Sequence, residues 1–266
     1  HLETRVAQIK FEASSNFVIF WCNDASTVDV RPESLYTTRQ WSGGHFPGDT
    51  GGVTRLTYTL YGNYSTATFG PHAVLEEADL PYTLELIDLS AGDNHAPDFL
   101  AMNPGGYVPV LRCEDGTVLF EAAAIMLYLA DQHQLTDLAP PPKDPTRGLL
   151  YRSLFFLTST VQEAYKHFYY PMKFTAERSA AEGIKEQSIQ LMVERWAMVE
   201  QMLDDNGPYF LGDRFSLADI YLVMLISWHD NMESILATNP AVKRNFDLVT
   251  ARPALQSILR DHGITA

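Results

Sequence analysis

NPGGYVPVLRCEDGTVLFEAAAI, residues 103–125, contains two short apolar runs separated by a turn and followed by a helix start. The runs VPVL and TVLF flank EDG, and Asp115-Gly116 is a dipeptide typical of a tight hairpin turn. Pro109 cannot donate a ladder hydrogen bond, so we expect it at a strand start or a sheet edge. Glu121 ends the second run, and the three alanines after it favour a helix. The segment therefore predicts a hairpin that leads directly into a helix.

The residues before this segment predict alternating strands and helices. Residues 56–61 alternate apolar and polar side chains, which is typical of a strand. Residues 71–80 predict a helix with a proline near its first turn, and residues 81–89 predict a second strand. A short helical piece is expected over 97–103. With a helix over 121–134, the expected order is β-α-β-(α)-β-β-α.

The residues after it predict only helices. Four prolines in TDLAPPPKDPTRG, residues 136–148, indicate a linker. Helical spacing of apolar residues predicts helices over 148–170 and 180–206. A third helix begins after Ser216 and is apolar nearly all round, so we expect it to be buried. Residues 251–263 predict an exposed terminal helix.

The start of the buried helix carries a capping signature. Ser216 is placed to be the N-cap, Asp219 can reach back to the Ser216 amide, and Phe215 can pack on Ile220. The pattern divides the chain into an N-terminal extension, an α/β domain, a linker and an all-helical domain, over residues 1–54, 55–135, 136–148 and 149–266.

Composition excludes several function classes. The net charge of −14 and the pI of about 4.9 argue against nucleic-acid or anionic-membrane binding. Cys22 and Cys113 lie far apart, so we expect no disulfide framework and a reducing compartment. No apolar run approaches the ~20 residues of a membrane span, and residues 1–12 lack the apolar core of a signal peptide. The patterns HExxH, CxxC and GxGxxG do not occur, so we expect neither a metal site nor a dinucleotide fold.

The motifs NPGGYVPVL, TVLFEAAAI and FLGDRFSLADI, in this order, resemble the glutathione transferase family over residues 56–262. The resemblance implies a thioredoxin-like β-α-β-β-α domain followed by a helical bundle. It also implies glutathione as co-substrate, a small hydrophobic electrophile as its partner, a homodimer and a cytoplasmic location. A cis peptide between Val108 and Pro109 is implied as well, beside Tyr107, with outward backbone groups that pair with glutathione as an added strand would.

Glu121 is expected to hold the γ-glutamyl end of glutathione. Its carboxylate can accept hydrogen bonds from an ammonium group, while the free amides of Ala122 and Ala123 point toward a carboxylate. The other interpretation is a simple acidic helix cap. The family usually has serine where this chain has Ala122, and losing that hydroxyl should weaken binding by roughly 0.5–1.5 kcal/mol.

A hydroxyl that donates to the glutathione sulfur would favour the thiolate. In the resembling family this group follows the first strand. The cysteine of bacterial members falls on Ala67, which excludes mixed-disulfide chemistry there, and the serine of other members falls on Thr66. Ser65 is the second candidate because a one-residue shift would exchange them, and Tyr61 and Asn63 are weaker candidates. Alternatively, the loop hydroxyls are ordinary turn residues.

The electrophile is expected to bind against aromatic side chains at the start of the helical domain and near the end of the buried helix. Core packing is the alternative for some of them. The predicted pocket residues are Tyr64, Tyr165, Phe168, Tyr169 and Trp228.

Three functions follow from this pattern. The first is conjugation of glutathione to a hydrophobic electrophile. The second is a glutathione transferase-like binding or interaction protein without turnover. The third is a specialised glutathione-dependent lyase, ether-cleaving enzyme, dehalogenase or isomerase.

The extension, residues 1–54, is too apolar for a free tail. We expect it to be a structural strap across the helical domain or a lid over the pocket.

Overall fold

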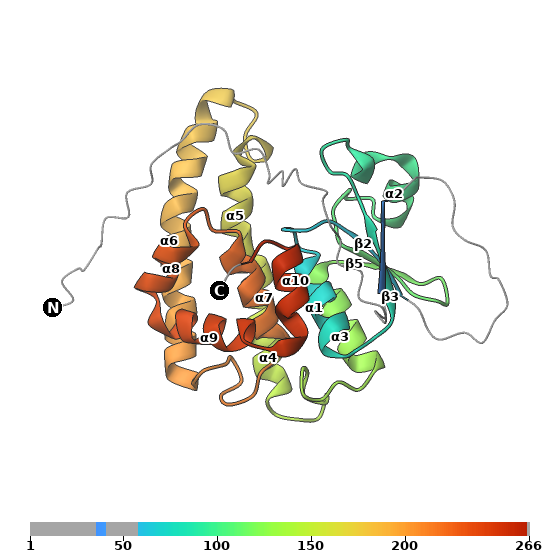
Figure 1. Ribbon diagram of the computed structural model, residues 1–266. Coiled ribbons are helices and arrows are strands. Elements are labelled where there is room, and N and C mark those ends of the chain that lie inside the picture. Colours follow the sequence, from blue (N-terminus) through green and yellow to red (C-terminus); the bar gives the residue numbers. More distant parts are fainter. Residues whose placement is uncertain (1–35, 41–57, 265–266) are drawn as a thin grey trace. The chain divides into compact units, whose positions relative to one another are not determined.

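The computed structural model describes residues 36–40 and 58–264 (Figure 1). The α/β part consists of β1 (Tyr36–Gln40), β2 (Tyr58–Gly62), α1 (Phe69–Glu77), β3 (Tyr82–Leu86), α2 (Pro97–Met102), β4 (Val110–Arg112), β5 (Val118–Phe120) and α3 (Ala122–Gln132). The helical part consists of α4 (Arg147–Phe156), a π-helical turn (Leu157–Val161), α5 (Gln162–Tyr169), α6 (Ala181–Asn206), α7 (Leu217–Ser227), α8 (Met232–Thr238), α9 (Pro240–Thr250) and α10 (Gln256–Asp261).

The strands form one mixed sheet in the order β1-β3-β2-β4-β5. β3 pairs in parallel with β1 and β2, whereas β2 with β4 and β4 with β5 are antiparallel. The hairpin predicted around Asp115-Gly116 joins β4 to β5, and Gly116 has the positive φ of 85° that such a turn requires. The four strands β2 to β5 with α1 and α3 confirm the predicted thioredoxin-like fold, and the helical part confirms the second half.

The two faces of the sheet bury different clusters, because side chains alternate along a strand. Leu60 and Leu111 face the large core, which α1 and α3 cover. Tyr61 and Val110 face the opposite side, where Phe99 and other α2 residues form a small second core. The sheet therefore lies between α2 and the pair α1 and α3.

β1 is an element that the sequence analysis did not assign. It lies inside the predicted extension and pairs in parallel with β3, with Tyr36 opposite Tyr82. This pairing is formed by backbone groups, so the side-chain pattern of residues 36–40 does not indicate it. Apart from β1, the extension lies outside the described residues, and so do Cys22 and the expected strap or lid.

The predicted helix over 148–170 contains a π-helical turn, Leu157–Val161, between α4 and α5. A π turn inserts an extra residue into an α-helix and is often found at functional sites. Between α3 and α4 no helix is formed over residues 133–146, whereas the linker was expected over 136–148, so its last two residues belong to α4. Arg147 and Asp131 join the two helices by a bidentate ion pair, with both N···O distances 2.9 Å.

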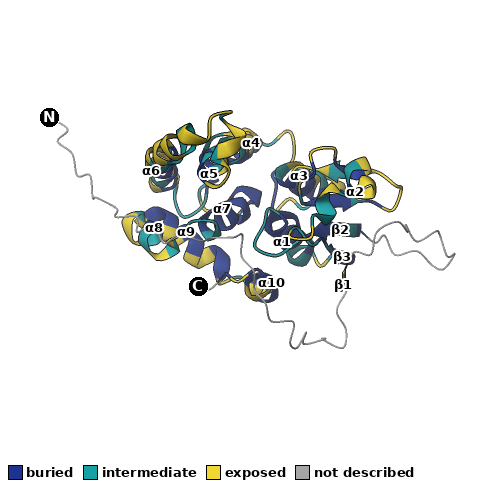
Figure 2. Ribbon diagram, turned by 90° about the horizontal axis from the view of Figure 1, so that it is seen from above, coloured by how far each residue is buried: buried dark blue, intermediate teal, exposed yellow. Residues whose placement is uncertain are grey.

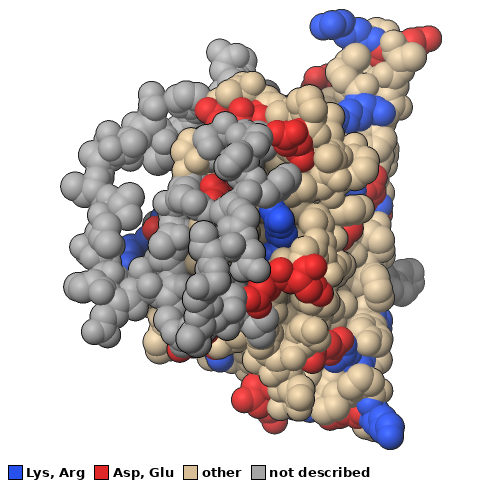
Figure 3. Space-filling view, turned by 90° about the vertical axis from the view of Figure 1, so that its right-hand side faces the viewer, with Lys and Arg blue, Asp and Glu red and all other residues tan. Residues whose placement is uncertain are grey.

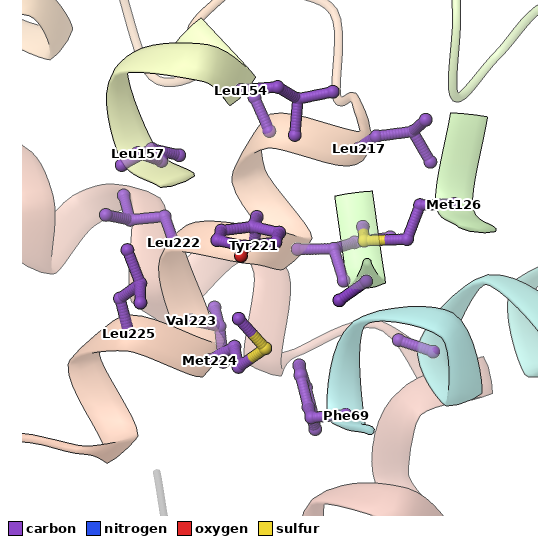
Figure 4. Close-up of a cluster of buried hydrophobic side chains, with 14 of the residues drawn as sticks. Phe69, Met126, Leu154, Leu157, Leu217, Tyr221, Leu222, Val223, Met224 and Leu225 are labelled. Carbon is purple, nitrogen blue, oxygen red and sulfur yellow. The ribbon is translucent and has the colours of Figure 1, made fainter. Parts of the chain in front are cut away.

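α7 lies at the centre of the structure. All its residues from Leu217 to Ile226 are buried, as its apolar sequence predicts, and Figure 2 shows it dark blue among the surrounding helices. It contacts α1 and α3 as well as α4 and α9. Phe69 and Met126 from the α/β part belong to the same cluster as the α7 side chains (Figure 4). One continuous core therefore joins the α/β part to the helical part.

The terminal helix is not exposed as expected. Leu255, Ile258, Leu259 and His262 are buried, because this segment packs against α1. Arg252 fixes the segment through a bidentate ion pair with Glu77 of α1, at 2.6 and 2.7 Å. The sequence of this segment alone does not show that one face is covered.

Part of one face of the surface is visible in Figure 3, and it carries both acidic and basic side chains. On the face in Figure 3, basic side chains lie singly among acidic and uncharged ones. Across residues 36–40 and 58–264, no helix has the length and apolarity needed to cross a membrane.

The predicted capping box at the start of α7 is formed. The Ser216 backbone N–H and hydroxyl donate to Asp219 Oδ2, both at 2.8 Å. Asp219 Oδ1 accepts from the Phe210 N–H at 3.1 Å and from Asn245 Nδ2 at 2.8 Å. A fully buried carboxylate thus receives four hydrogen bonds, which offset part of the cost of burying its charge, although burial still raises the pKa of Asp219 to about 6.

Replacing Asp219 by alanine should leave these donors without an acceptor. We expect Asp219→Ala to lower the free energy of unfolding by about 3 kcal/mol or more, measured by urea denaturation. The exposed neighbour Asp213 provides the matched control, since Asp213→Ala should change stability by no more than about 0.5 kcal/mol. Equal effects of the two substitutions would contradict this role of Asp219.

Candidate functional site

The loop before β4 is held by two asparagines. Buried Asn103 donates from Nδ2 to the Tyr107 carbonyl at 2.8 Å and accepts from the Gly105 N–H at 3.0 Å. Asn94 donates to the Gly106 carbonyl at 2.7 Å. Gly106 has a positive φ of 65°, and a Cβ there would lie 2.9 Å from His95 Nδ1, so glycine is required.

This loop presents the residues predicted to line the edge of the site. The Val108–Pro109 peptide is cis, as the resemblance implied. Val108 is half-buried and Pro109 buried, whereas the Tyr107 side chain is 59% exposed. The three residues therefore form a continuous border that runs from the surface into β4.

Glu121 stands between β5 and α3 in an unusual backbone conformation. Its φ is 70°, a region that non-glycine residues rarely occupy and that clusters at functional sites. The side chain is exposed and makes no capping hydrogen bond. No other residue in the described ranges hydrogen-bonds to its carboxylate.

The start of α3 leaves backbone donors open next to Glu121. The first intrahelical hydrogen bond runs from the Ile125 N–H to the Glu121 carbonyl, at 3.0 Å. The N–H groups of Ala122, Ala123 and Ala124 come before it and have no side-chain cap among the described residues. A carboxylate and several amide donors thus lie side by side, an arrangement that matches an amino-acid head group.

The loop over residues 63–68 is closed by its own hydroxyls. The Thr66 hydroxyl donates to the Asn63 carbonyl at 2.6 Å and lies 2.9 Å from Thr68 Oγ1. Thr68 accepts from the Asn63 N–H at 3.1 Å. Because Thr66 has one proton, Thr68 is the donor in their mutual contact. Gly62 permits this closure, since a Cβ there would lie 2.3 Å from Thr68 side-chain atoms.

Ser65 is held from the other end of the chain. Its N–H donates to His262 Nδ1 at 3.1 Å, and its hydroxyl donates to the His262 carbonyl at 2.9 Å. Ser65 has a positive φ of 55°. Of the two predicted hydroxyls, Ser65 is therefore bonded to the C-terminal segment, whereas Thr66 is bonded only within its own loop.

The two weaker candidates have structural roles. Tyr61 is 5% exposed and packs in the small core under α2. Asn63 donates from Nδ2 to the Ile87 carbonyl at 2.8 Å and accepts from the Tyr64 N–H at 2.7 Å.

Four of the five predicted pocket residues gather in the helical part. Tyr165 makes ring contacts with Tyr169 and Trp228, and Phe168 makes an edge contact with Tyr169. Tyr165 is 2% exposed and its hydroxyl accepts from Trp196 Nε1 at 3.2 Å, so it is also part of the core. Phe168 is likewise buried.

The accessible part of the group is formed by Tyr169, which is 39% exposed, and half-buried Trp228. The Tyr169 hydroxyl donates to the Trp228 carbonyl or to Asp230 Oδ1, which lie 2.5 and 2.7 Å away. Tyr64 is separate from this group and makes an edge contact with His262, with 5.3 Å between ring centres.

Sequence reasoning missed residues that approach the site from the helical part. Buried Tyr221 of α7 donates to Gln162, which directly follows the π turn (Figure 4 shows Tyr221). Burial and the negative charge of Glu121 raise the pKa of Tyr221. Lys173 Nζ lies 3.0 Å from the Tyr107 hydroxyl and over the Tyr170 ring. Only the interruption of the helix at Pro171 marked this region in the sequence.

Comparison with known proteins agrees with this geometry. Residues 64–132 match the family model of the glutathione S-transferase N-terminal domain, and residues 159–262 match that of the C-terminal domain. The chain belongs to the glutathione S-transferase family. Together the two matches include residues 64–68 of the loop, the border at Tyr107–Pro109, Glu121 and α7.

Individual members of the glutathione S-transferase family are similar to this chain over most of their length. Glutathione S-transferase GstA of Escherichia coli O157:H7 is 26% identical over 77% of this chain and 98% of its own. Maleylacetoacetate isomerase of Pseudomonas aeruginosa is 28% identical over 75% and 92%. A Sulfitobacter glutathione transferase homolog, solved with bound glutathione, is 32% identical with a TM-score of 0.70, over 79% of this chain and 99% of its own. Within the described part of this family member, no three His, Cys, Asp or Glu side chains cluster as metal ligands would.

Two buried histidines should make the stability of this glutathione S-transferase family member depend on pH. Burial lowers the pKa of His72 to about 3, and burial together with His72 lowers the pKa of His262 well below 6.5. Unfolding lets both rings bind protons below about pH 6.5, so stability is complete above that pH and falls as the pH decreases toward the folded values. Between about pH 6 and 4.5 His72 alone should contribute a loss that approaches ~1.4 kcal/mol per pH unit, and His262 adds a loss of the same sign. Burial raises the pKa of the Asp219 carboxyl to about 6, so this group binds a proton in the folded state over the same range and offsets part of the loss.

Urea denaturation at several pH values measures this slope. Burial also lowers the pKa of His133 and His229, which adds to the loss with the same sign. The double variant His72→Gln/His262→Asn should be less stable at pH 7 but lose less stability on acidification. A wild-type stability that stays constant from pH 7 to 4.5 would contradict the buried neutral histidines.

Proposed function

We propose that the chain is a glutathione transferase that conjugates glutathione to a small hydrophobic electrophile. The observation that carries this proposal is Glu121, an exposed carboxylate at a strained position beside the open amides of α3. Family membership and the relative solved with bound glutathione support it. Each group of the site then has one role toward glutathione, either in binding it or in activating its thiol.

The γ-glutamyl end of glutathione binds at Glu121. Its ammonium group donates to the Glu121 carboxylate, and its carboxylate accepts from the Ala122 and Ala123 amides. The backbone of Val108 pairs with the cysteinyl residue, while Pro109 and Tyr107 border it. Ala122 supplies an amide but no hydroxyl, which leaves binding weaker than with serine at this position.

Thr66 is the group that we assign to the thiol. Its hydroxyl rotates from the Asn63 carbonyl to the sulfur and lowers the thiol pKa by donating to the thiolate. The backbone N–H groups of Thr66 and Ala67 lack acceptors among the described residues and lie just before α1, where negative charge is stabilised. Ser65 is less suited, because it would have to leave His262.

The reaction itself is a nucleophilic substitution or addition at carbon. The thiol proton passes to solvent, the sulfur lone pair forms the new C–S bond, and a leaving group, where present, departs with its bonding electrons. Tyr169 and Trp228 border the acceptor. Because glutathione supplies the sulfur, the chain needs no cysteine at Ala67.

The assembly and location that we propose follow from this assignment. We propose a homodimer, supported by Phe155, which is 61% exposed beside Tyr151 on one face of α4; light scattering in solution tests it. A cytoplasmic location and a role in detoxification fit a reaction that consumes reduced glutathione, and cell fractionation tests the location.

Glutathione titration and conjugation of a chloronitrobenzene test the function. Binding with turnover supports it, and binding without turnover supports a non-catalytic protein. Isomerisation is the second candidate, because one similar protein is a maleylacetoacetate isomerase. It predicts that glutathione is regenerated when a cis unsaturated diketo acid is converted. The absence of glutathione binding would exclude both conjugation and isomerisation.

Replacing Glu121 by glutamine should weaken glutathione binding. The substitution keeps the size of the side chain and removes the charge that pairs with the ammonium group. We expect the Kd from calorimetry to rise on the order of tenfold or more, as for a lost charge-assisted hydrogen bond of ~1.5–3 kcal/mol. The exposed Glu114→Gln provides a control in the same hairpin. An unchanged Kd for Glu121→Gln would remove it from the site.

Replacing Thr66 by alanine should raise the pKa of the bound thiol and shift the pH–rate profile toward alkaline pH. Glutathione affinity should change little, because the hydroxyl acts mainly on the thiolate. Thr66→Ser is the matched control, since it retains the hydroxyl. If both variants have the wild-type profile, thiol activation rests with the loop amides instead.

A further inference from the structure

His262 lies near the end of the chain but is enclosed by the candidate site. It caps α10, is 2% exposed and makes edge contacts with Tyr64 and Phe69 at 5.3 and 5.2 Å between ring centres. Its partners belong to the loop before α1 and to α1 itself. The C-terminal segment therefore reaches into the loop that we assign to thiol activation.

The contact with Ser65 determines which ring nitrogen of His262 carries the proton. A backbone N–H can only donate, so His262 Nδ1, 3.1 Å from the Ser65 nitrogen, must be the acceptor. The proton of the neutral ring is therefore on Nε2, where it faces His72 Nδ1 at 3.1 Å. The same residue accepts the Ser65 hydroxyl with its carbonyl oxygen.

The hydrogen bonds continue in one direction beyond His262. His72 accepts at Nδ1, so its own proton is on Nε2 and is donated to the Tyr82 hydroxyl at 2.6 Å. Tyr82 donates in turn to Glu76 Oε1 at 2.7 Å. Each donor and acceptor in this series of hydrogen bonds has a defined role, and the series ends at Glu76, which is a fixed acceptor. Because burial keeps the pKa of both histidines low, the rings remain neutral and keep this direction.

We propose that His262 is a positioning residue that holds the 63–68 loop in the geometry needed for thiol activation. The inference rests on the proposed function in one respect, namely that this loop acts on the glutathione thiol. His262 keeps Ser65 in its positive-φ conformation and accepts the hydrogen bond of the Ser65 hydroxyl with its carbonyl oxygen. Thr66 is then the hydroxyl that can turn to the sulfur. His72 selects the tautomer of His262 that can accept the Ser65 amide.

Two substitutions separate the two sides of the imidazole. In His262→Asn, the side-chain oxygen takes the place of Nδ1, so Ser65 keeps its acceptor while the contact with His72 is lost. In His262→Gln, the longer amide takes the place of Nε2, so the contact with His72 is kept while Ser65 loses its acceptor. Arg260→Gln, on the exposed side of α10, is the control for general effects of changing this helix.

The first measurement needs no glutathione. Hydrogen exchange of the Ser65 amide in the full chain should be about fivefold or more faster in His262→Gln, as for one lost neutral hydrogen bond. It should stay near the wild-type rate in His262→Asn and Arg260→Gln. Equal rates in the Asn and Gln variants would overturn the inference, whatever the protein binds.

The second measurement uses glutathione. The ultraviolet absorbance of the bound thiolate against pH should give a higher thiol pKa in His262→Gln than in His262→Asn. The same comparison should show a several-fold lower kcat, with KM for glutathione nearly unchanged. If exchange differs but the thiol pKa and kcat do not, His262 stabilises the loop without positioning it for catalysis, and the inference is wrong. A wild-type chain that binds no glutathione would instead refute the proposed function, and the exchange experiment would still decide whether His262 holds the loop.

Discussion

The structure depends on the enclosure of α7. A helix whose residues from Leu217 to Ile226 are all buried cannot lie on the surface of a helical bundle alone. It requires apolar partners on every side, which the α/β part provides through α1 and α3 and the helical part through α4 and α9. The polar groups that are buried with α7 must form hydrogen bonds inside the protein. Asp219 accepts from four donors, and Tyr221 donates to Gln162.

This shared core also places the candidate site. The 63–68 loop and Glu121 lie immediately before α1 and α3, the two helices of the α/β part that rest on α7. The site is therefore formed by short segments with special backbone geometry on helices that cannot easily shift. Tyr221 and Lys173 add contributions from the helical part: burial and the charge of Glu121 raise the pKa of Tyr221, and Lys173 Nζ lies 3.0 Å from the Tyr107 hydroxyl.

The features that could be predicted from the sequence have short-range causes. The turn at Asp115-Gly116, the box at Ser216 and Asp219 and the placement of Glu121 depend on neighbouring residues. The contact of Ser65 with His262 spans 197 positions, and no local pattern distinguishes such a histidine from one in solvent. The buried face of the terminal helix was missed for the same reason, and the π turn was missed because the apolar spacing passes through it without interruption. The sequence also left Ser65 and Thr66 equivalent, whereas their hydrogen bonds separate them.

The pairing of β1 with β3 changes which backbone is open to other proteins. Without β1, the sheet would end at YTLEL, a strand with two leucines and unpaired peptide groups on one side. Such an edge is a template on which a strand of another molecule can add. The five residues YTTRQ occupy it instead, so the sheet ends on a short strand that contains arginine and no large aliphatic residue. The segment that precedes the family's common region thereby reduces the tendency of these molecules to join edge to edge.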